Sequence, residues 1–387
     1  MKLSRRMSRL GTETAFEVLA EAKKLEKQGK DIVHLQIGEP DFKTPTHIVE
    51  SAVQALRDGH HHYTPSAGIW ELREAIAQYI SSTRKISVTP EEVVVTPGGK
   101  PIIFFTMLAL AQKGDEIVYP NPGFPIYASM IEYVGAHAVP IPLREENNFR
   151  LDLDELVKVL SPRTRMIILN SPNNPTGSIL EKDDLQALSE ILAGRDIMVF
   201  SDEIYSQILY DGQTHHSISS FPGMKERTII LEGFSKTYAM TGWRLGYGVM
   251  NPRLAEQITK LMINSNSCTA AFTQLAGISA IKGPLTDTKK MVATLKKRRD
   301  RMLTLLNQIE GVSCVKPEGA FYLFPNVSGL RWKSYELSQL LLNKSGVALL
   351  SGTAFGIYGE GHLRISYATS MKKLEEGMKR FIDLVEG

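Results

Sequence analysis

Residues 228–249 read TIILEGFSKTYAMTGWRLGYGV, and the order of apolar and polar residues in this stretch indicates the fold. The stretch begins with a short apolar, β-branched run at Thr228–Leu231, becomes polar around Lys236, and returns to an apolar run at Trp243–Val249. Continuous apolar runs of this length are typical of strands that are buried on both faces. We therefore expect two buried strands joined by a polar loop that carries Lys236 and leads to Arg244.

Apolar runs of the same kind occur upstream, and helical patterns separate them. The runs are Val93–Val95, Ile117–Val118, Met166–Leu169 and Ile197–Phe200. The helical patterns are Ile102–Leu110, Leu153–Leu160 and Lys182–Ala193. Strands that alternate with helices predict an α/β fold whose mostly parallel sheet is covered by helices on both faces.

The two ends of the chain have other patterns. Helical spacing at Thr14–Lys27 precedes a short apolar segment, Ile32–Ile37. From about Ala255 the chain is expected to be helical through Leu306. Later strands are expected at Cys314–Val315, Ala320–Phe324 and His362–Ser366, before a final helix at Lys372–Val385. These patterns predict an N-terminal arm that joins a small domain (1–44), a large domain (45–282) and a small α+β domain (283–387).

Polar, glycine-rich and proline-rich segments follow the carboxyl ends of four predicted strands. These segments are Thr96–Lys100, Asn170–Gly177, Ser201–Tyr205 and Glu232–Lys236. Open α/β sheets bind ligands in the crevice outside these strand ends. The segments therefore predict one site that combines a glycine loop, an amide, a carboxylate, a phenol and a lysine.

Nucleotide and metal motifs do not explain this site. No G-x-G-x-x-G follows the first strand, and no G-x-x-x-x-G-K-[ST] occurs in the chain. No H-x-x-H or C-x-x-C spacing suggests a metal, and His60-His61-His62 is interpreted as a polar turn. We therefore expect no metal in the site.

Pyridoxal 5′-phosphate (PLP) fits the same inventory. Its phosphate requires backbone N–H groups at the start of a helix, and Gly98-Gly99-Lys100 precede the helical run Ile102–Leu110. Its protonated pyridine nitrogen requires a carboxylate, for which Asp202 is the candidate. Its aldehyde requires a lysine that forms a Schiff base, for which Lys236 is the candidate.

Three further side chains are candidates for contacts to the PLP ring. Asn174 and Tyr205 can donate hydrogen bonds to the phenolic oxygen of the ring. Phe124, in the segment Asn121–Pro125, is an aromatic side chain that can cover one ring face.

Composition and charge argue against several other classes of protein. Hydrophobic residues make up 43% and charged residues 22% of the chain, and the net charge is only +3, which is ordinary for a globular protein. The densest basic run, Lys296–Arg299, is interpreted as a solvated helix face and not as a nucleic-acid patch. Cys268 and Cys314 are the only cysteines, too few for a disulfide framework, which suits a reducing compartment.

The N-terminal residues carry basic side chains but lack the apolar core and cleavage site of a secretory signal. The longest apolar candidate for a membrane span, Ile102–Ala111, is too short to cross a bilayer. We therefore expect a cytoplasmic protein without membrane partners.

The order and spacing of several motifs resemble those of the fold-type I, class I PLP-dependent aminotransferases, and most closely the bacterial aspartate aminotransferase branch. The matching segments extend along essentially the whole chain: Asn173–Gly177, Asp202–Tyr205, Ser235–Thr237, Gly242–Gly246 and His362–Ser366. The resemblance implies a large domain with a seven-stranded sheet sandwiched by helices, and a homodimer with shared active sites.

The resemblance also implies residues that bind the PLP phosphate. Arg244 and Ser235 would contact this phosphate, and Tyr63 would reach the phosphate of the neighbouring subunit. Many relatives have a serine three positions before the lysine, where this chain has Gly233. Phosphate binding is therefore expected to depend more on Arg244, Ser235 and the loop Gly98–Lys100.

The implied reaction moves the α-amino group of an L-amino acid to a 2-oxo acid such as 2-oxoglutarate. Arg364 would hold the substrate α-carboxylate, with Gly38 and Asn174 beside it. Lys236 would act as general base and acid. Asp202 would keep the pyridine nitrogen protonated.

Two other functions remain open from the sequence. The same residues serve C–S β-lyases and aminocyclopropane-carboxylate synthases on this fold. A non-enzymatic regulator domain is the alternative of another class, but such chains carry a DNA-binding domain ahead of this fold, for which we expect no room here.

The amino donor is predicted from two residues. In the aspartate branch, a lysine after the paired glycines and a threonine near the N-terminus contact the second carboxylate of the substrate, and Lys100 and Thr14 match them. A cation at the pocket rim would favour aspartate or glutamate. Alanine, methionine or aromatic donors are the alternative, because Phe105, Met107 and Tyr127 could line an apolar pocket.

Overall fold

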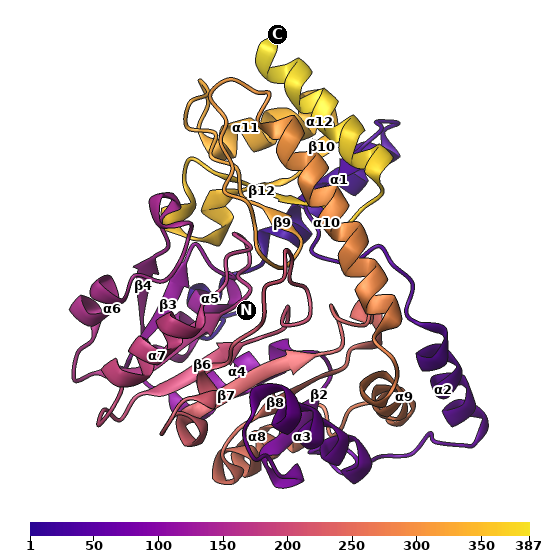
Figure 1. Cartoon of the computed structure of the whole chain (residues 1–387), viewed down its shortest axis with the longest axis vertical. Helices are drawn as coiled ribbons and strands as arrows, with labels where there is room; N and C mark the ends of the chain where they lie inside the picture. The colour runs from indigo at the N-terminus through magenta and orange to yellow at the C-terminus, as the bar shows by residue number, and fades with distance from the viewer.

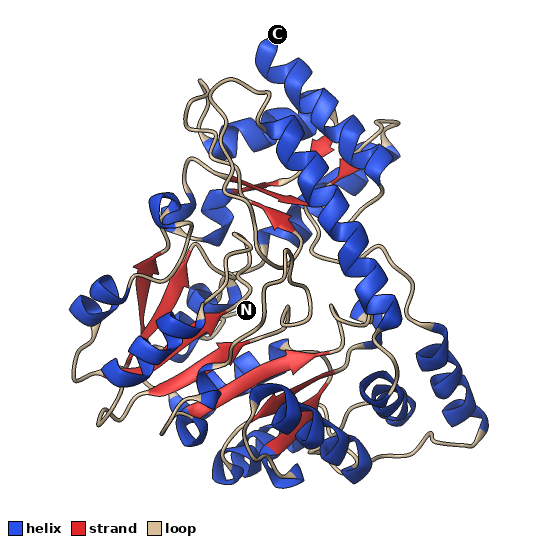
Figure 2. Cartoon of the chain, viewed as in Figure 1, coloured by secondary structure: helices blue, strands red, loops and turns tan.

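The computed structural model describes the whole chain, residues 1–387. A wide sheet with helices on both sides forms the larger part of the molecule, in the lower half of Figure 1. A smaller group of helices and short strands lies above it (Figure 2). This smaller group contains segments from both ends of the chain, coloured indigo and orange to yellow in Figure 1.

The central sheet has seven strands, whose spatial order differs from their order along the chain. In spatial order they are β2 (Val93–Thr96), β8 (Gly246–Val249), β7 (Thr228–Gly233), β6 (Met198–Asp202), β5 (Thr164–Asn170), β3 (Glu116–Asn121) and β4 (His137–Pro142). All neighbouring pairs are parallel except those that β8 makes with β2 and β7. The predicted α/β fold with a mostly parallel sheet is confirmed.

Helices cover both faces of this sheet. On one face lie α4 (Lys100–Leu110), α5 (Ile126–Val134) and α8 (Pro252–Ser265). On the other lie α2 (Thr46–Arg57), α3 (Trp70–Arg84), α6 (Leu153–Val159), α7 (Lys182–Ile191) and α9 (Ala271–Lys282). Val94 packs with the first group, whereas Val93 and Val95 pack with the second, as the two-residue period of a strand requires. Because both faces are buried, the middle of each central strand is mostly apolar.

The smaller part contains two short sheets, three helices from the C-terminal segment and one from the N-terminal segment. The C-terminal helices are α10 (Thr286–Leu306), α11 (Ser334–Leu340) and α12 (Met371–Glu386). One sheet pairs β1 (Val33–His34) with β10 (Val347–Ala348), and the other has the order β11 (Leu350–Ser351), β12 (Leu363–Ser366), β9 (Tyr322–Leu323). Helix α1 (Thr14–Lys27) packs beside them, and its buried Ala22 and Leu25 contact Ala348.

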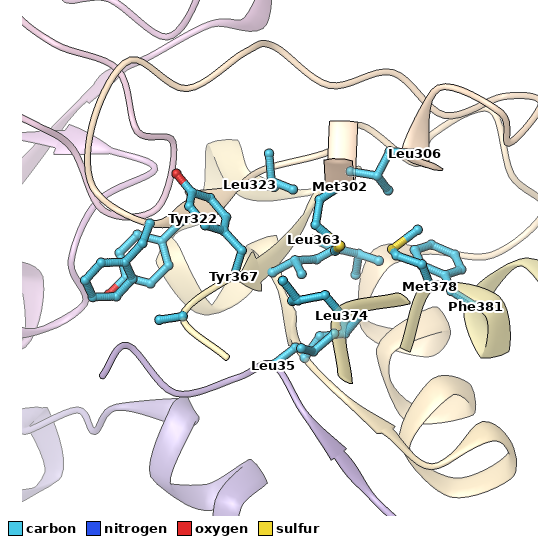
Figure 3. Close-up of a cluster of buried hydrophobic side chains, with 14 of the residues drawn as sticks. Leu35, Met302, Leu306, Tyr322, Leu323, Leu363, Tyr367, Leu374, Met378 and Phe381 are labelled. Carbon is cyan, nitrogen blue, oxygen red and sulfur yellow. The ribbon is translucent and has the colours of Figure 1, made fainter. Parts of the chain in front are cut away.

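The core of the smaller part joins residues that are distant in sequence. Figure 3 shows Leu35, from the N-terminal segment, next to Leu374 and in one buried cluster with Leu363 and Phe381 from the C-terminal segment. The N-terminal segment therefore belongs to the same hydrophobic core as the C-terminal one. The domain limits at residues 44/45 and 282/283 remain predictions.

Several predicted elements differ from the structure. The helix expected from Ala255 to Leu306 is divided into α8, α9 and α10, and Gly283 and Pro284 lie at the second break. Only an isolated bridge at Ser313 stands where a strand at Cys314–Val315 was expected. Strand β4 was missed because it contains Pro140 and Pro142, which lack N–H donors and are tolerated at a sheet edge.

None of the helices combines the length and the apolar character that crossing a bilayer requires.

Candidate active site

A cavity of about 490 Å³ lies at the carboxyl ends of β5, β6 and β7, against the smaller part of the molecule. Eleven of the residues predicted for the site line this cavity. They are Gly38, Gly99, Lys100, Phe124, Asn174, Asp202, Tyr205, Ser235, Lys236, Arg244 and Arg364. The parallel strands therefore bring together the polar segments that follow them, as expected for this class of sheet.

Lys236 follows β7, and its amine lies inside the cavity. Its Nζ donates a hydrogen bond to the backbone oxygen of Gly38 (2.6 Å). Burial lowers the pKa of Lys236 to about 8, while the charges of Glu13 and Glu39 partly oppose that decrease. The amine is therefore partly neutral near physiological pH, as a base or nucleophile must be.

Asp202 ends β6 and is buried. The hydroxyl of Tyr127, on α5, donates a hydrogen bond to Asp202 Oδ2 (2.6 Å), and the backbone N–H of Ile204 donates to Oδ1 (3.3 Å). Burial raises the pKa of Asp202 to about 6, and these hydrogen bonds limit the increase. The sequence suggests Tyr127 only as a residue that could line an apolar pocket. Its contact with Asp202 depends on α5, a helix that the sequence pattern does not predict.

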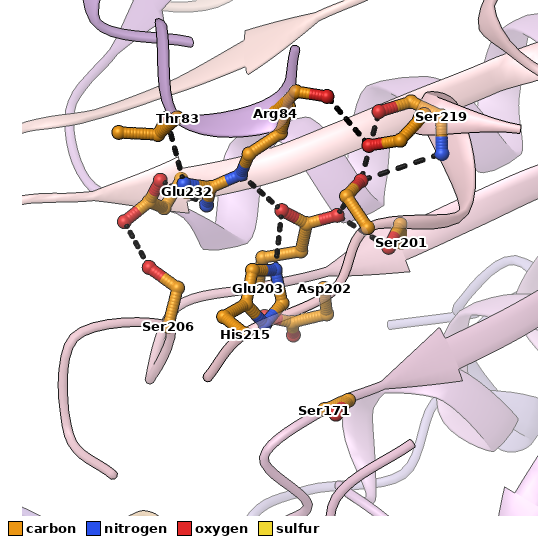
Figure 4. A network of polar contacts seen from close by, with 12 residues as sticks. Thr83, Arg84, Ser171, Ser201, Asp202, Glu203, Ser206, His215, Ser219 and Glu232 are labelled. Carbon is orange, nitrogen blue, oxygen red and sulfur yellow. Dashed lines mark hydrogen bonds and ion pairs between the residues drawn. The ribbon is translucent and has the colours of Figure 1, made fainter. Parts of the chain in front are cut away.

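A buried charge network lies behind Asp202 (Figure 4). Arg84, at the end of α3, donates from Nε to Glu203 Oε2 and from Nη2 to Glu232 Oε2, both at 2.8 Å. His215 Nε2 also lies 2.9 Å from Glu203 Oε2. Burial alone would raise the pKa of Glu203, but Arg84 and His215 hold it well below its usual range. The network joins α3 to the ends of β6 and β7, which carry Asp202 and Lys236.

Two glycines form a concave surface next to Arg244. Gly98 has φ +91°, and a Cβ on it would lie 2.3 Å from Arg244 Nη2. Gly99 is the N-cap of α4, whose first N–H groups have no partner within the helix. Gly233 also has no room for the serine found in many relatives, because a Cβ there would lie 2.9 Å from the Cα of Gly246.

Arg364 lies on β12 and is buried against the opposite wall. Its Nη1 donates to Asn174 Oδ1 (3.1 Å), and its Nη2 donates to the backbone oxygen of Gln36. Its Nε is buried and has no hydrogen-bond partner. Burial lowers the pKa of Arg364, because a buried guanidinium without a bound anion is costly to keep charged.

Two aromatic contacts complete this side of the cavity. The guanidinium of Arg364 lies over the ring of Tyr322, 4.5 Å from its centroid. The hydroxyl of Tyr322 in turn lies 2.7 Å from that of Tyr205. Tyr322 was not among the predicted site residues, because a tyrosine in an apolar run such as Ala320–Phe324 has the pattern of an ordinary core residue.

Lys100 reaches the mouth of the cavity, where its charge has a partner. Its Nζ donates to Glu13 Oε2 and lies 5.4 Å and 5.7 Å from the ring centroids of Phe16 and Phe124. Glu13, Ala15 and Phe16 line the cavity, whereas Thr14 lines a smaller adjoining hollow. Glu13 is therefore the N-terminal residue that contacts Lys100, and Thr14, predicted as a substrate contact, does not line the main cavity.

Three other predictions fall outside the cavity. Phe105 and Met107 are buried in the core beside the sheet and line no apolar pocket at the site, so that prediction is wrong. Gly98 lies behind the cavity wall, against Arg244. Tyr63 is 89% exposed and away from the cavity of its own chain.

Comparison with known proteins identifies the family. The sequence pattern of the family described as "Aminotransferase class I and II" matches residues 30–381. The chain belongs to this family. An aspartate aminotransferase of Pyrococcus abyssi is 42% identical over 91% of both chains. Aromatic-amino-acid aminotransferase 2 of Thermococcus litoralis is 41% identical over 90% of both chains.

A solved structure agrees with this assignment. The aspartate aminotransferase of Thermus thermophilus with maleate matches with a TM-score of 0.94 and 35% identity, covering 99% of this chain and 100% of that one. The predicted membership of the fold-type I aminotransferases, in the branch named for aspartate aminotransferases, is confirmed. The protein is a PLP-dependent transaminase, and the lyase, synthase and regulator alternatives are not favoured.

The cavity of this aminotransferase fits PLP. Gly99 and Arg244 line the cavity together, and the missing side chain of Gly98 lets the Arg244 guanidinium lie against this turn, which suits a phosphate. Asp202 supplies a buried carboxylate and Lys236 a partly neutral amine on neighbouring strands. No cluster of histidine, cysteine, aspartate or glutamate with the geometry of a metal site is present.

Proposed function

We propose that Lys236, Asp202 and Arg364 carry the chemistry of this transaminase. When bound, PLP supplies an electron-withdrawing ring that stabilises negative charge at the substrate α-carbon. Lys236 Nζ, neutral in part because of burial, would act as the base that takes the proton from that carbon and then as the acid that gives this proton up. The Asp202 carboxylate would hold the proton on the pyridine nitrogen, and the hydroxyl of Tyr127, which donates to Oδ2, keeps that carboxylate oriented.

The other predicted residues of the cavity would bind PLP and orient its ring and its phosphate. Tyr205 and Asn174 donate hydrogen bonds to the phenolic oxygen of the ring, and Phe124 covers a ring face. Ser235, Arg244 and the backbone N–H groups of Gly99 and Lys100 bind the phosphate. This assignment is supported by the position of all these residues on the wall of one cavity.

Arg364 binds the α-carboxylate of both substrates in this proposal. Its unpaired Nε and its fixed orientation between Asn174 and Gln36 support a bidentate grip on a carboxylate. Gly38 would contribute a contact on the same side, next to Lys236.

We further infer that the amino donor is aspartate or glutamate and the acceptor 2-oxoglutarate. The observation that carries this inference is the cationic Nζ of Lys100 at the cavity mouth. The name of the Pyrococcus abyssi relative supports the same donor. A second carboxylate gains a charge-assisted contact with Lys100, whereas an apolar side chain gains nothing from it.

Aromatic donors are the second candidate. The rings of Phe16 and Phe124 flank Lys100, and the Thermococcus litoralis relative is named for aromatic amino acids. The two candidates are separated by kcat/KM for aspartate, glutamate, alanine and phenylalanine in the wild type and in Lys100→Ala. Acidic donors should be preferred by the wild type, and the preference should decrease selectively in the variant. If Lys100→Ala lowers all four values equally, Lys100 does not recognise the second carboxylate.

We also infer a cytoplasmic homodimer with shared sites. The two cysteines form no disulfide, which suits a reducing compartment. Tyr63 is an aromatic side chain left exposed, which suits a contact with a second subunit.

A further inference from the structure

Glu13 places a carboxylate from the chain itself at the mouth of the substrate cavity. It is the N-cap residue of α1, yet its side chain makes no capping hydrogen bond. The carboxylate instead accepts a hydrogen bond from Lys100 Nζ. Helix initiation therefore does not explain the position of this side chain.

The segment before Glu13 is held against α5. The Nε of Arg9 donates to the backbone oxygen of Glu132 (2.8 Å), and the N–H of Gly11 donates to Ser129 Oγ (3.0 Å). Residues 1–12 are otherwise exposed. These two contacts fix the direction in which the chain enters α1, and they thereby bring Glu13 to Lys100.

The pair between Glu13 and Lys100 can be exchanged at low cost. The side chain of Lys100 remains 46% exposed and that of Glu13 21% exposed. Ion pairs with this much solvent contact contribute little to stability. A carboxylate on a substrate could therefore replace Glu13 at Lys100, but it would have to approach against the negative charge of Glu13.

We propose that Glu13 determines substrate specificity by taking the place of the substrate's second carboxylate at Lys100. A donor with a neutral side chain leaves the pair intact beside the rings of Phe16 and Phe124. A dicarboxylic donor must displace Glu13, so the preference for acidic substrates is smaller than Lys100 alone would give. This inference rests on the proposed role of Lys100 toward acidic substrates.

The test compares two unreactive ligands, maleate and 3-phenylpropionate, as inhibitors of the PLP-loaded enzyme. Both have a carboxylate for Arg364, but only maleate has a second one for Lys100. The measured quantity is the ratio of the two inhibition constants, which does not depend on the fraction of active protein. In Glu13→Gln and Glu13→Ala, this ratio should change by about 3–10 times in favour of maleate, compared with the wild type. The reason is that the variants lack the carboxylate that competes with maleate for Lys100.

Two further variants control the interpretation. Glu17→Gln removes an exposed carboxylate one turn along α1 and should leave the ratio unchanged. In a Lys100→Gln background, Glu13→Gln should no longer favour maleate, because the shared partner is missing. A ratio unchanged in both Glu13 variants, or shifted equally by Glu17→Gln, overturns the inference, as does a shift that persists without Lys100.

The experiment separates this inference from the proposed function. If the wild type fails to prefer aspartate and glutamate while the ratio still responds to Glu13 through Lys100, the donor proposal is wrong and the role of Glu13 stands. If the preference for acidic donors is present and the ratio does not respond, Glu13 has no such role.

Discussion

Lys236 and Asp202 occupy one cavity, and burial moves their pKa values toward each other. The pKa of Lys236 falls from 10.5 to about 8, and that of Asp202 rises from 3.8 to about 6. In both cases the low-polarity surroundings disfavour the charged form. The site is therefore prepared to exchange protons near neutral pH before any substrate is bound.

The pH dependence of covalent PLP capture tests the pKa of Lys236. Only the neutral amine attacks an aldehyde, so its fraction rises with pH up to the pKa and is constant above it. The rate of capture by the cofactor-free chain, divided at each pH by that of a free lysine analogue, should be highest below pH 8. This ratio of rates should fall between about pH 8 and about pH 10.5, because the analogue loses its proton in this range while the neutral fraction of Lys236 no longer rises.

Lys236→Ala is the control for this measurement. It should bind PLP without a bond that borohydride can fix. A ratio that is constant over the whole pH range would show that the amine titrates as an ordinary lysine.

Arg364→Lys tests the proposed carboxylate site. A lysine keeps the charge but cannot offer the two parallel N–H groups of a guanidinium. We expect KM for both the amino acid and the oxo acid to rise by about tenfold to a hundredfold, with PLP affinity retained. Steady-state kinetics with each substrate varied in turn measure the effect. If neither KM changes, the α-carboxylate is held elsewhere.

At the scale of the elements, the turn between β2 and α4 forms the anion site proposed for the PLP phosphate. Gly98 has a positive φ that side chains rarely adopt, and its missing side chain is what lets the Arg244 guanidinium lie against the backbone. Gly98→Ala should therefore displace Arg244 and weaken PLP binding by about tenfold or more. A PLP titration followed by absorbance measures this.

Gly114→Ala is a matched control for Gly98→Ala. Gly114 also has a positive φ, +97°, but a Cβ on it would meet no atom within 4 Å. It carries the same backbone strain without the contact to Arg244, so PLP affinity should be unchanged. Equal losses of affinity in the two variants would attribute the effect to strain alone.

The network of Arg84 connects α3 to two strand ends. Arg84→Met would leave Glu203 and Glu232 buried without their cation. Breaking a buried pair in this way costs about 3–5 kcal/mol, so the free energy of unfolding should fall by a similar amount. Denaturant unfolding of the cofactor-free chain measures it, with the exposed Arg57→Met as control. A loss below about 1 kcal/mol would mean that the carboxylates are neutral or hydrated in the native protein.

At the scale of the whole molecule, the cavity is shared between the two parts of the chain. Asn174 and Lys236 belong to loops of the large sheet, whereas Arg364 and Tyr322 come from the smaller part. The hydrogen bond of Arg364 to Asn174 crosses this boundary, whereas its bond to Gln36 stays within the smaller part. In the proposed function, substrate binding at Arg364 is therefore coupled to how the two parts are packed.

Subunit mixing tests the proposed dimer. If Tyr63 serves the neighbouring site, a hybrid of a Tyr63→Phe subunit with a Lys236→Ala subunit regains one intact site. An equal mixture should therefore recover about a quarter of wild-type activity at limiting PLP. The double variant Tyr63→Phe/Lys236→Ala, mixed with wild type, should form hybrids without an intact site. No recovery in the first mixture, or a fully active monomer in sedimentation, would contradict shared sites.

The sequence predicted most of the site because of how parallel sheets are built. Segments that follow the apolar runs, such as Asn174 after β5 and Asp202 at the end of β6, must meet at one edge once the strands pair in parallel. Periodicity was sufficient to predict the central strands, since both of their faces are buried. It was insufficient for β4, an edge strand with two prolines, and for the breaks that separate α8, α9 and α10.

Local residue order therefore determined the fold class and which candidate residues, Lys236 among them, line the cavity, because these depend on short motifs at the ends of regular elements. Only the tertiary structure decided which side chains complete the site from distant segments. Tyr127 reaches Asp202, Tyr322 reaches Tyr205, and Glu13 reaches Lys100 across 75, 117 and 87 residues of sequence. Such contacts depend on how separate elements pack, and packing depends on the direction and depth of each element, which no local pattern of apolar and polar residues specifies.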